Sequence, residues 1–194
     1  MKKKLRCHIQ MLVLFLCLFS GRLYAGDMND LFEKVEQLTL ERNGYVLGAA
    51  LNKGQMETAE ANPVDATSMD TFKFKDKNLY VVAQKTSNRV LVMYEQFETA
   101  SQQKIQDLVG DLSMNFDDPT VLAHDKVVYW AYGEKGKITS KEFDTARQDK
   151  KKLTILATVK FMSDINITEK VKQPVMGHVY YIISSDPILK LLQD

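Results

Sequence analysis

Two apolar segments joined by a short polar one constrain the fold of this chain more than any other feature. Residues 79–84 (LYVVAQ) and 90–94 (VLVMY) are rich in β-branched and aromatic side chains, and residues 86–88 between them are turn formers. The pattern predicts a β-hairpin. Because both faces of each strand carry apolar side chains, we expect the two strands to be central in a sheet and covered on both sides.

An amphipathic helix is predicted directly after this hairpin, over residues 99–115. Thr99 and Gln102 have the spacing of a capping box at its start. Apolar residues follow at the spacing of one helical face: Ile105, Leu108, Val109 and Leu112. We expect this helix to cover one face of the sheet.

The first 25 residues have the pattern of a secretory signal peptide. Basic residues precede an apolar run over 11–19, and Ala25 is a small residue that suits a signal peptidase. One alternative is a retained membrane anchor, but a run of about ten residues is too short to cross roughly 30 Å of hydrocarbon. Another is lipoprotein processing at Cys17, whose two preceding residues are larger than such a site prefers. We expect cleavage before Gly26 and export to the periplasm or the extracellular space.

Cleavage would change the composition of the chain. The full sequence has 26 basic and 25 acidic residues, and the leader removes five of the basic ones, so the mature chain carries 21 basic and 25 acidic residues, a net charge of about −4. That balance gives no reason to expect nucleic acid or an anionic membrane surface as a partner. Both cysteines leave with the leader, so the mature chain has no disulfide and no thiolate ligand. No integral membrane span remains after cleavage.

The rest of the chain alternates helix and strand patterns. A helix is predicted over 28–42 with Asn43-Gly44 as its stop, and a strand over 45–51, where Gly48 leaves room for a packed neighbour or a ligand. Further strands are predicted over 71–75, 126–132, 153–161 and 179–184. A capping box of Thr139 and Glu142 predicts a short helix to about residue 149, and Asp186 is predicted to cap a last helix.

Two polar stretches, 52–70 and 163–177, are predicted to be exposed loops. Nothing in the sequence suggests a linker between two domains. We therefore expect residues 26–194 to form a single α+β domain with a mainly antiparallel sheet of about five to seven strands and amphipathic helices packed on one or both faces.

Candidate chemistry in the mature chain centres on two histidines, His124 and His178. With Asp118 and its acidic neighbours, His124 could serve as a metal ligand or a general base. Neither histidine has a second His or a carboxylate three or four residues away on a predicted helix, the spacing common in metal sites. Motifs for nucleophilic catalysis, phosphate binding and dinucleotide binding do not occur. We therefore predict no catalytic residue, no metal and no cofactor. If the protein did hold a metal ion, the candidate ligands would be His124, Asp118 and His178.

Aromatic residues on two predicted strands give the best candidate contact surface. One strand carries Tyr129, Trp130 and Tyr132, and the other carries Tyr180 and Tyr181. If the strands pair, alternate rings emerge on opposite faces, one set filling the core and the other free to contact a ligand or partner. Tyrosine and tryptophan are also enriched at interface hot spots. We predict that Tyr129, Trp130 and Tyr132 contact the ligand or protein partner.

The leading hypothesis is an exported accessory or binding protein of the cell envelope that contacts a protein partner or a small apolar ligand. The alternative is an exported hydrolase or metal-dependent enzyme built around His124 and the nearby aspartates.

Overall fold

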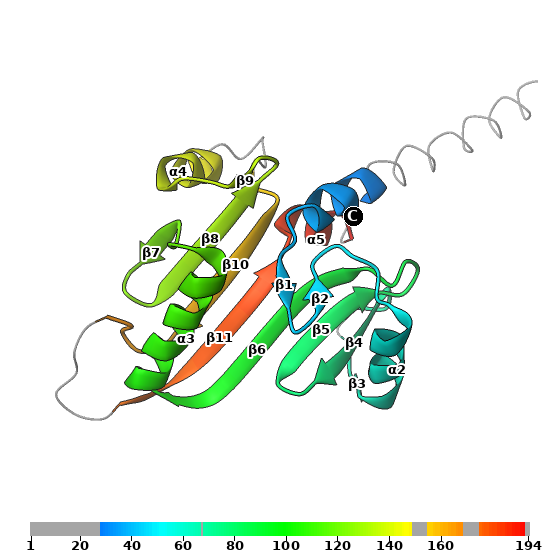
Figure 1. The fold of residues 1–194 in the computed structure, drawn as a ribbon, viewed down its shortest axis with the longest axis horizontal. Coiled ribbons are helices and arrows are strands. Elements are labelled where there is room, and N and C mark those ends of the chain that lie inside the picture. The colour runs from blue at the N-terminus through cyan, green and yellow to red at the C-terminus, as the bar shows by residue number, and fades with distance from the viewer. Residues whose placement is uncertain (1–27, 67, 149–154, 169–174, 193–194) are drawn as a thin grey trace, which may run out of the picture.

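The computed structural model describes residues 28–66, 68–148, 155–168 and 175–192. The predicted signal peptide lies outside them. The described residues form one α+β domain with a large antiparallel sheet, as predicted. That sheet has nine strands, where about five to seven were expected, and there is a separate two-stranded sheet. The large sheet has the order β3-β4-β5-β6-β11-β10-β8-β7, with β9 beside β8 (Figure 1). Strand β11 therefore lies between β6 and β10, although it follows both in the chain.

The strands of the large sheet are β3 (Pro63–Val64), β4 (Thr71–Asp76), β5 (Leu79–Gln84), β6 (Val90–Ser101), β7 (Val121–Ala123), β8 (Val127–Gly133), β9 (Gly136–Lys137), β10 (Ala157–Ser163) and β11 (Met176–Ser184). The small sheet pairs β1 (Glu41–Arg42) with β2 (Tyr45–Val46). The helices are one over residues 28–36, then α2 (Lys53–Ala61), α3 (Gln102–Phe116), α4 (Ser140–Gln148) and α5 (Asp186–Leu191). None of the described helices is long and apolar enough to cross a membrane.

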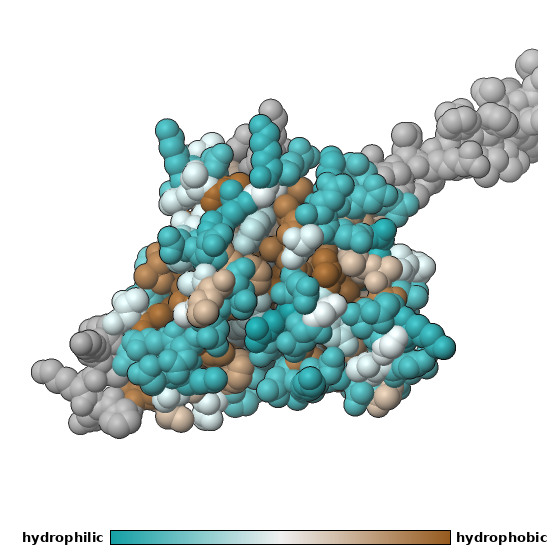
Figure 2. Space-filling view, in the orientation of Figure 1, coloured by the Kyte–Doolittle hydropathy of each residue, from teal (hydrophilic) through white to brown (hydrophobic). Residues whose placement is uncertain are grey.

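One face of the large sheet, the covered face, holds the hydrophobic core. Helix α3, the helix over 28–36 and the β1–β2 hairpin lie over it, and α2 packs at its β3–β4 edge (Figure 1). A cross-strand row of fully buried side chains runs from β4 to β8 on this face: Phe74, Val81, Met93, Ile183, Val159 and Trp130. Hydrophilic side chains cover most of the outer surface on this side (Figure 2).

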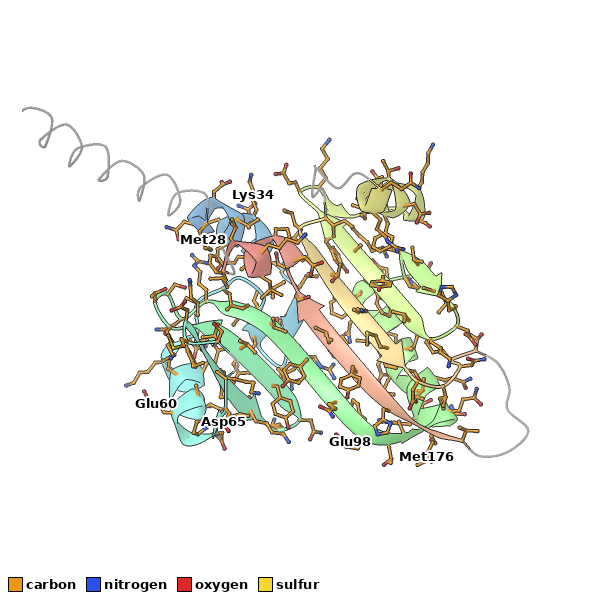
Figure 3. The ribbon with its side chains drawn as sticks, turned by 180° about the vertical axis from the view of Figure 1, so that it is seen from behind. Met28, Lys34, Glu60, Asp65, Glu98 and Met176 are labelled. Carbon is orange, nitrogen blue, oxygen red and sulfur yellow. The ribbon has the colours of Figure 1, made fainter. Side chains whose placement is uncertain are left out.

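The opposite face, which we call the open face, is in full view from behind (Figure 3). Along β5, β10 and β11 every second residue is only partly buried, so the burial alternates with the period of two expected for a sheet covered on one side. Strands β5 and β6 are central and form the predicted hairpin. The prediction that they are covered on both sides is wrong for the described residues, since no described helix or strand lies over the middle of this face.

The predicted helix over 28–42 is wrong beyond residue 36. Thr39 has a φ of 51°, which ends the helical path, and the chain then enters β1. Asn43 and Gly44 have φ values of 53° and 83° and connect β1 to β2 with Arg42 paired to Tyr45. Asn-Gly with two positive φ angles is the preferred two-residue hairpin turn, so this dipeptide reverses the chain between two strands and does not stop a helix.

The predicted strand over 45–51 shortens to Tyr45–Val46, but the packing alternative for Gly48 is confirmed. A Cβ at Gly48 would lie 3.0 Å from both the backbone nitrogen of Glu36 and the backbone oxygen of Phe32. The absence of a side chain therefore lets this segment touch the backbone of the helix over 28–36.

The predicted loop over 52–70 is wrong, because it contains α2 and β3. Asn52 accepts a hydrogen bond from the backbone N–H of Gln55, and the Gln55 side chain accepts one from the backbone N–H of Asn52. This reciprocal capping box starts α2. The predicted loop over 163–177 is correct for residues 164–168 and 175. Ser163 belongs to β10 and Met176 begins β11, and residues 169–174 lie outside the described ranges.

The helix caps follow the predictions in part. The hydrogen bonds of the Thr139–Glu142 capping box are present before α4. Strand β6 runs through residue 101, so α3 begins later than predicted and Ser101, rather than Thr99, accepts the capping hydrogen bond. At α5 the cap is the buried Ser185, one residue before the predicted Asp186.

Candidate functional site

A continuous row of side chains crosses the open face. Successive cross-strand pairs from β8 to β4 place the following residues in line: Tyr129, Lys160, Ile182, Tyr94, Tyr80 and Lys75. The first five are partly buried and Lys75 is exposed. Neighbouring strands lie about 4.8 Å apart, so the row is about 24 Å long. We call it the open-face row.

The β5–β6 end of the row is a flat aromatic platform. The rings of Tyr80 and Tyr94 stack with centroids 4.8 Å apart and an interplanar angle of 9°. The Lys75 Nζ lies 4.9 Å from the centre of the Tyr80 ring, a cation–π distance. Val82 and Val92 form the adjacent cross-strand pair and extend the apolar surface. Cross-strand stacking holds both rings in place.

The β8–β10 end of the row forms the floor of a hollow of about 700 Å³. Helices α4 and α5 contribute to its walls. Its floor and walls are lined by Tyr129, Ala157, Thr158, Lys160, Ile182 and Ser184 from the sheet, Phe143, Ala146 and Arg147 from α4, Ile155 from the segment before β10, and Asp186 and Lys190 from α5. The Tyr129 and Phe143 rings lie 5.4 Å apart, and this aromatic pair joins the floor to the α4 wall.

The hollow has an excess of positive charge. Among the described residues that line it, Lys160, Arg147 and Lys190 are basic and only Asp186 is acidic. Among the described residues none of these three cations forms an ion pair. Lys160 Nζ lies 5.4 Å from the centre of the Tyr129 ring, and the Arg147 guanidinium carbon lies 5.8 Å from that of Phe143. The hollow therefore combines aromatic walls with cations that have no ion-pair partner in the part of the chain that the structure describes.

The three predicted binding residues do not share one surface. Strand β10 separates β8 from β11, so these strands do not pair with each other. Tyr129 faces the open side, as part of the row. Trp130 is 0% exposed and donates its indole N–H to the backbone oxygen of Asp117 at 2.7 Å. Tyr132 is 9% exposed, and burial raises its pKa to about 12. Trp130 and Tyr132 therefore belong to the covered side, and only Tyr129 is placed to touch a ligand.

His124 and Asp118 lie at opposite ends of the short strand β7. His124 is exposed in the β7–β8 turn, where it and Asp125 have φ values of 52° and 53°. Asp118 is exposed near the end of α3, where its backbone oxygen accepts a hydrogen bond from Lys137. His and Asp tolerate positive φ angles better than most residues, so the structure gives His124 a role in forming this turn.

His178 pairs with carboxylates on the surface of β11. Its Nδ1 lies 3.1 Å from Asp164 Oδ2 and its Nε2 lies 3.6 Å from Glu98 Oε2. Desolvation raises the pKa of Asp164, but the hydrogen bonds from His178 outweigh it and hold that pKa below its ordinary value. Within the described ranges no group of three or more His, Cys, Asp and Glu side chains could hold a metal ion.

A buried polar cluster lies on the covered face. Glu95 on β6 is 5% exposed and accepts a hydrogen bond of 2.6 Å from Arg42 on β1. The Arg42 guanidinium also lies over the Tyr181 ring, at 5.4 Å from its centre. The Tyr181 hydroxyl has no hydrogen-bond partner among the described residues, and a cavity of about 20 Å³ adjoins it. Such a volume has room for one water molecule, so the cluster is a packing feature and not a ligand site.

Sequence reasoning missed Lys160 and the open-face row. The signal was present in residues 157–163 (ATVKFMS), where Lys160 interrupts an apolar strand that has apolar strands on either side in the sequence. The sequence pattern does not show which face of this strand the helices cover, so it does not show what Lys160 faces. Compared with protein-family models, curated proteins and solved structures, the chain shows no match.

Proposed function

We propose that this protein is an exported, non-catalytic binding protein of the cell envelope, and that it contacts a partner protein through the open face of its sheet. The observation that carries the proposal is the open-face row, with its stacked Tyr80–Tyr94 pair and the flanking Val82–Val92 pair. Contiguous apolar patches of this kind mark interaction sites on monomeric domains.

The dimensions of the open face favour a protein over a single small ligand. The row is about 24 Å long, and three alternate residues along each strand add about 20 Å in the other direction, which gives roughly 500 Å². A standard protein–protein interface buries about 800 Å² on each partner. The open face therefore supplies most of one side of such an interface.

The residue types also suit a partner protein. Tyrosine rings offer a large apolar area with few rotatable bonds, and their hydroxyl groups can stay hydrated or bond across an interface. Burial, together with the neighbouring Tyr80, raises the pKa of Tyr94, so this ring stays neutral at physiological pH. The two stacked rings therefore present aromatic surface that carries no charge of its own, beside the ammonium of Lys75.

Site-directed photocrosslinking in the native host tests this proposal. A photoreactive residue at position 94 is expected to form a discrete adduct with one envelope protein, and the same residue at position 114, an 86% exposed site on α3, is expected to form none. Replacing Tyr80 by Ala in the position-94 protein should weaken the adduct, because losing an aromatic anchor can cost 2 kcal/mol or more, about thirtyfold in affinity. Equal adducts from both positions would contradict the proposal.

The enzyme alternative has its own discriminating variant. Folded His124→Ala protein is expected to keep its role in cells, because His124 is an exposed turn residue. Loss of that role in His124→Ala, with an unchanged position-94 adduct, would favour the enzyme.

Export is tested separately by N-terminal sequencing of the protein recovered from the cell envelope. The expected first residue is Gly26. Intact Met1, or a lipid on Cys17, would overturn the assignment of a cleaved leader.

A further inference from the structure

We propose that the hollow between α4 and α5 binds a small amphipathic carboxylate, with its apolar chain against the aromatic wall and its carboxylate at Lys160. This inference goes beyond the proposed protein contact and does not depend on it, since it rests on the opposite end of the open-face row.

The hollow has the size and lining of a small-molecule site. Its volume of about 700 Å³ falls within the roughly 300–1,000 Å³ typical of ligand pockets. Such pockets are lined mainly by apolar and aromatic side chains, with a few polar groups that fix the orientation of the ligand. Here the apolar lining is Tyr129, Phe143, Ala146, Ile155 and Ile182.

Lys160 is the residue that most needs an explanation. Lysine is depleted in strands, and its common use there is to protect an exposed sheet edge. Strand β10 is not an edge, because β8 and β11 pair with it on both sides. The cross-strand neighbours of Lys160 are Tyr129 and Ile182, and its side chain is partly buried among them. Lys160 has no carboxylate partner among the described residues, and a partly desolvated ammonium of this kind is stabilised when an anion binds beside it.

Two further cations favour an anion over a neutral ligand. Arg147 and Lys190 line the same hollow from α4 and α5. Each lies in the last turn of its own helix, where the helix dipole favours a cation, so their presence alone has a structural reason. Lys160 lies in the middle of β10, where no helix dipole accounts for it, and its ammonium lies over the Tyr129 ring. Among the described lining residues the three cations face the one carboxylate of Asp186, and this positive hollow lies on a mature chain with more acidic than basic residues.

The aromatic wall defines the rest of the ligand. The Tyr129 and Phe143 rings lie 5.4 Å apart at a tilt of 41° and line the same side of the hollow. An aliphatic chain packs against such a lining without directional bonds, and its burial removes apolar surface from water. A carboxylate at Lys160 and an aliphatic chain along Tyr129 and Phe143 therefore match the lining in both charge and polarity.

Isothermal titration of the purified mature protein tests this inference with three probes of equal chain length: decanoate, decyltrimethylammonium and decanol, each below the concentration at which it aggregates. Saturable binding of one decanoate per protein is expected. The cationic probe is expected not to bind, and decanol is expected to bind at least tenfold more weakly than decanoate. Equal affinity for all three probes, or no binding of decanoate, would overturn the proposal.

Lys160→Met keeps the aliphatic stem and removes the charge, so it should weaken decanoate binding about tenfold or more. Lys104→Met, at an exposed position on α3 over the covered face, is the matched control and should leave the affinity unchanged. Circular dichroism and the melting temperature show whether both variants fold. If Lys160→Met does not fold, Arg147→Met on the surface of α4 replaces it and should weaken binding severalfold. Equal affinities of the charge-removed variant and the control would contradict the assignment. The position-94 crosslinks do not depend on this outcome, so either proposal can fail alone.

Discussion

Arg42 Nε lies 2.6 Å from Glu95 Oε1, and this contact ties the β1–β2 hairpin to the middle of the large sheet. Glu95 is buried between its cross-strand neighbours Leu79 and Tyr181. Desolvation alone would lower the pKa of Arg42, but the hydrogen bond and the charge of Glu95 outweigh it and raise that pKa. The pair is therefore a charge-assisted hydrogen bond, and removing either side chain should destabilise the folded protein.

Arg42→Ala is expected to lower the free energy of unfolding by about 3 kcal/mol, because it leaves the Glu95 carboxylate buried and unpaired. The partial exposure of Arg42 places the value at the lower end of the range for buried pairs. Replacing both Arg42 and Glu95 by Leu removes the charge together with its partner, so the double variant should lose less stability than Arg42→Ala. Denaturant unfolding at neutral pH measures both. A double variant that is less stable than the single one would show that the pair is not a desolvated one.

Gly48→Ala is expected to destabilise the protein more than Gly44→Ala. Both glycines have a φ near 84°, so both substitutions place alanine in a left-handed conformation at about 1–2 kcal/mol. A Cβ at Gly44 meets nothing within 4 Å, whereas one at Gly48 meets helix backbone at 3.0 Å. The difference between the two unfolding free energies therefore isolates the crowding. Equal losses would mean that Gly48 is required for its φ alone.

Leu112→Ala tests whether α3 is a structural cover. Leu112 is 4% exposed in the core, and Leu→Ala at such sites costs about 2–5 kcal/mol. Met114, two residues further along the same helix, is 86% exposed, so Met114→Ala should change stability by less than about 0.5 kcal/mol. Chemical unfolding of both variants checks the contrast, and a loss at Leu112 as small as that at Met114 would show that this helical face is not packed.

Stability is expected to fall at alkaline pH, because tyrosines ionise more readily in the unfolded chain. Burial, with a hydrogen bond to Asp76, raises the pKa of Tyr45 to about 12, and burial raises that of Tyr132 to about 12 as well. An unfolded tyrosine has a pKa near 10, so this contribution is complete below about pH 10 and is lost as the pH rises through about 12.

Melting temperatures across that window measure the alkaline loss. Tyr45→Phe removes one of the ionising groups, so its melting temperature should fall less steeply between about pH 10 and pH 12 than that of the wild type. The comparison uses the change with pH, since the variant also lacks the hydrogen bond to Asp76. Identical slopes would show that Tyr45 ionises equally easily in both states.

Local patterns predicted the fold class and most strands, because alternating apolar residues and turn residues can be recognised from short stretches of sequence. The hairpin of β5 and β6 and the capping box at Thr139 are of this kind. Asn43-Gly44 was wrongly predicted to end a helix, because the same dipeptide can end a helix or form a hairpin turn. Which of the two structures forms depends on the tertiary packing around it. Asn52 and Gln55 had a capping signature that was overlooked because the residues around them are polar.

The open face could not be predicted from the same patterns. Apolar residues such as Tyr80 and Val82 appear identical in sequence whether a helix covers them or solvent does. The placement of Trp130 in the core and of Tyr129 outside it depends on which face the helices choose, and that is a property of the whole packing. Lys160 becomes informative only once β10 is known to be central.

The position of β11 between β6 and β10 has a consequence for how the protein is made. The two halves of the sheet share no direct pairing, and the strand that joins them follows both in the chain. The β6–β11 ladder pairs residues more than 70 positions apart, such as Met176 with Ser101 and Ser184 with Val92. Pairing at such separations is slow and comes late in folding. A chain interrupted before β11 would hold two incomplete sheets with unpaired edge strands. Such edges do no harm in a chain that crosses a membrane unfolded, but among other nascent chains they would pair with those chains and aggregate.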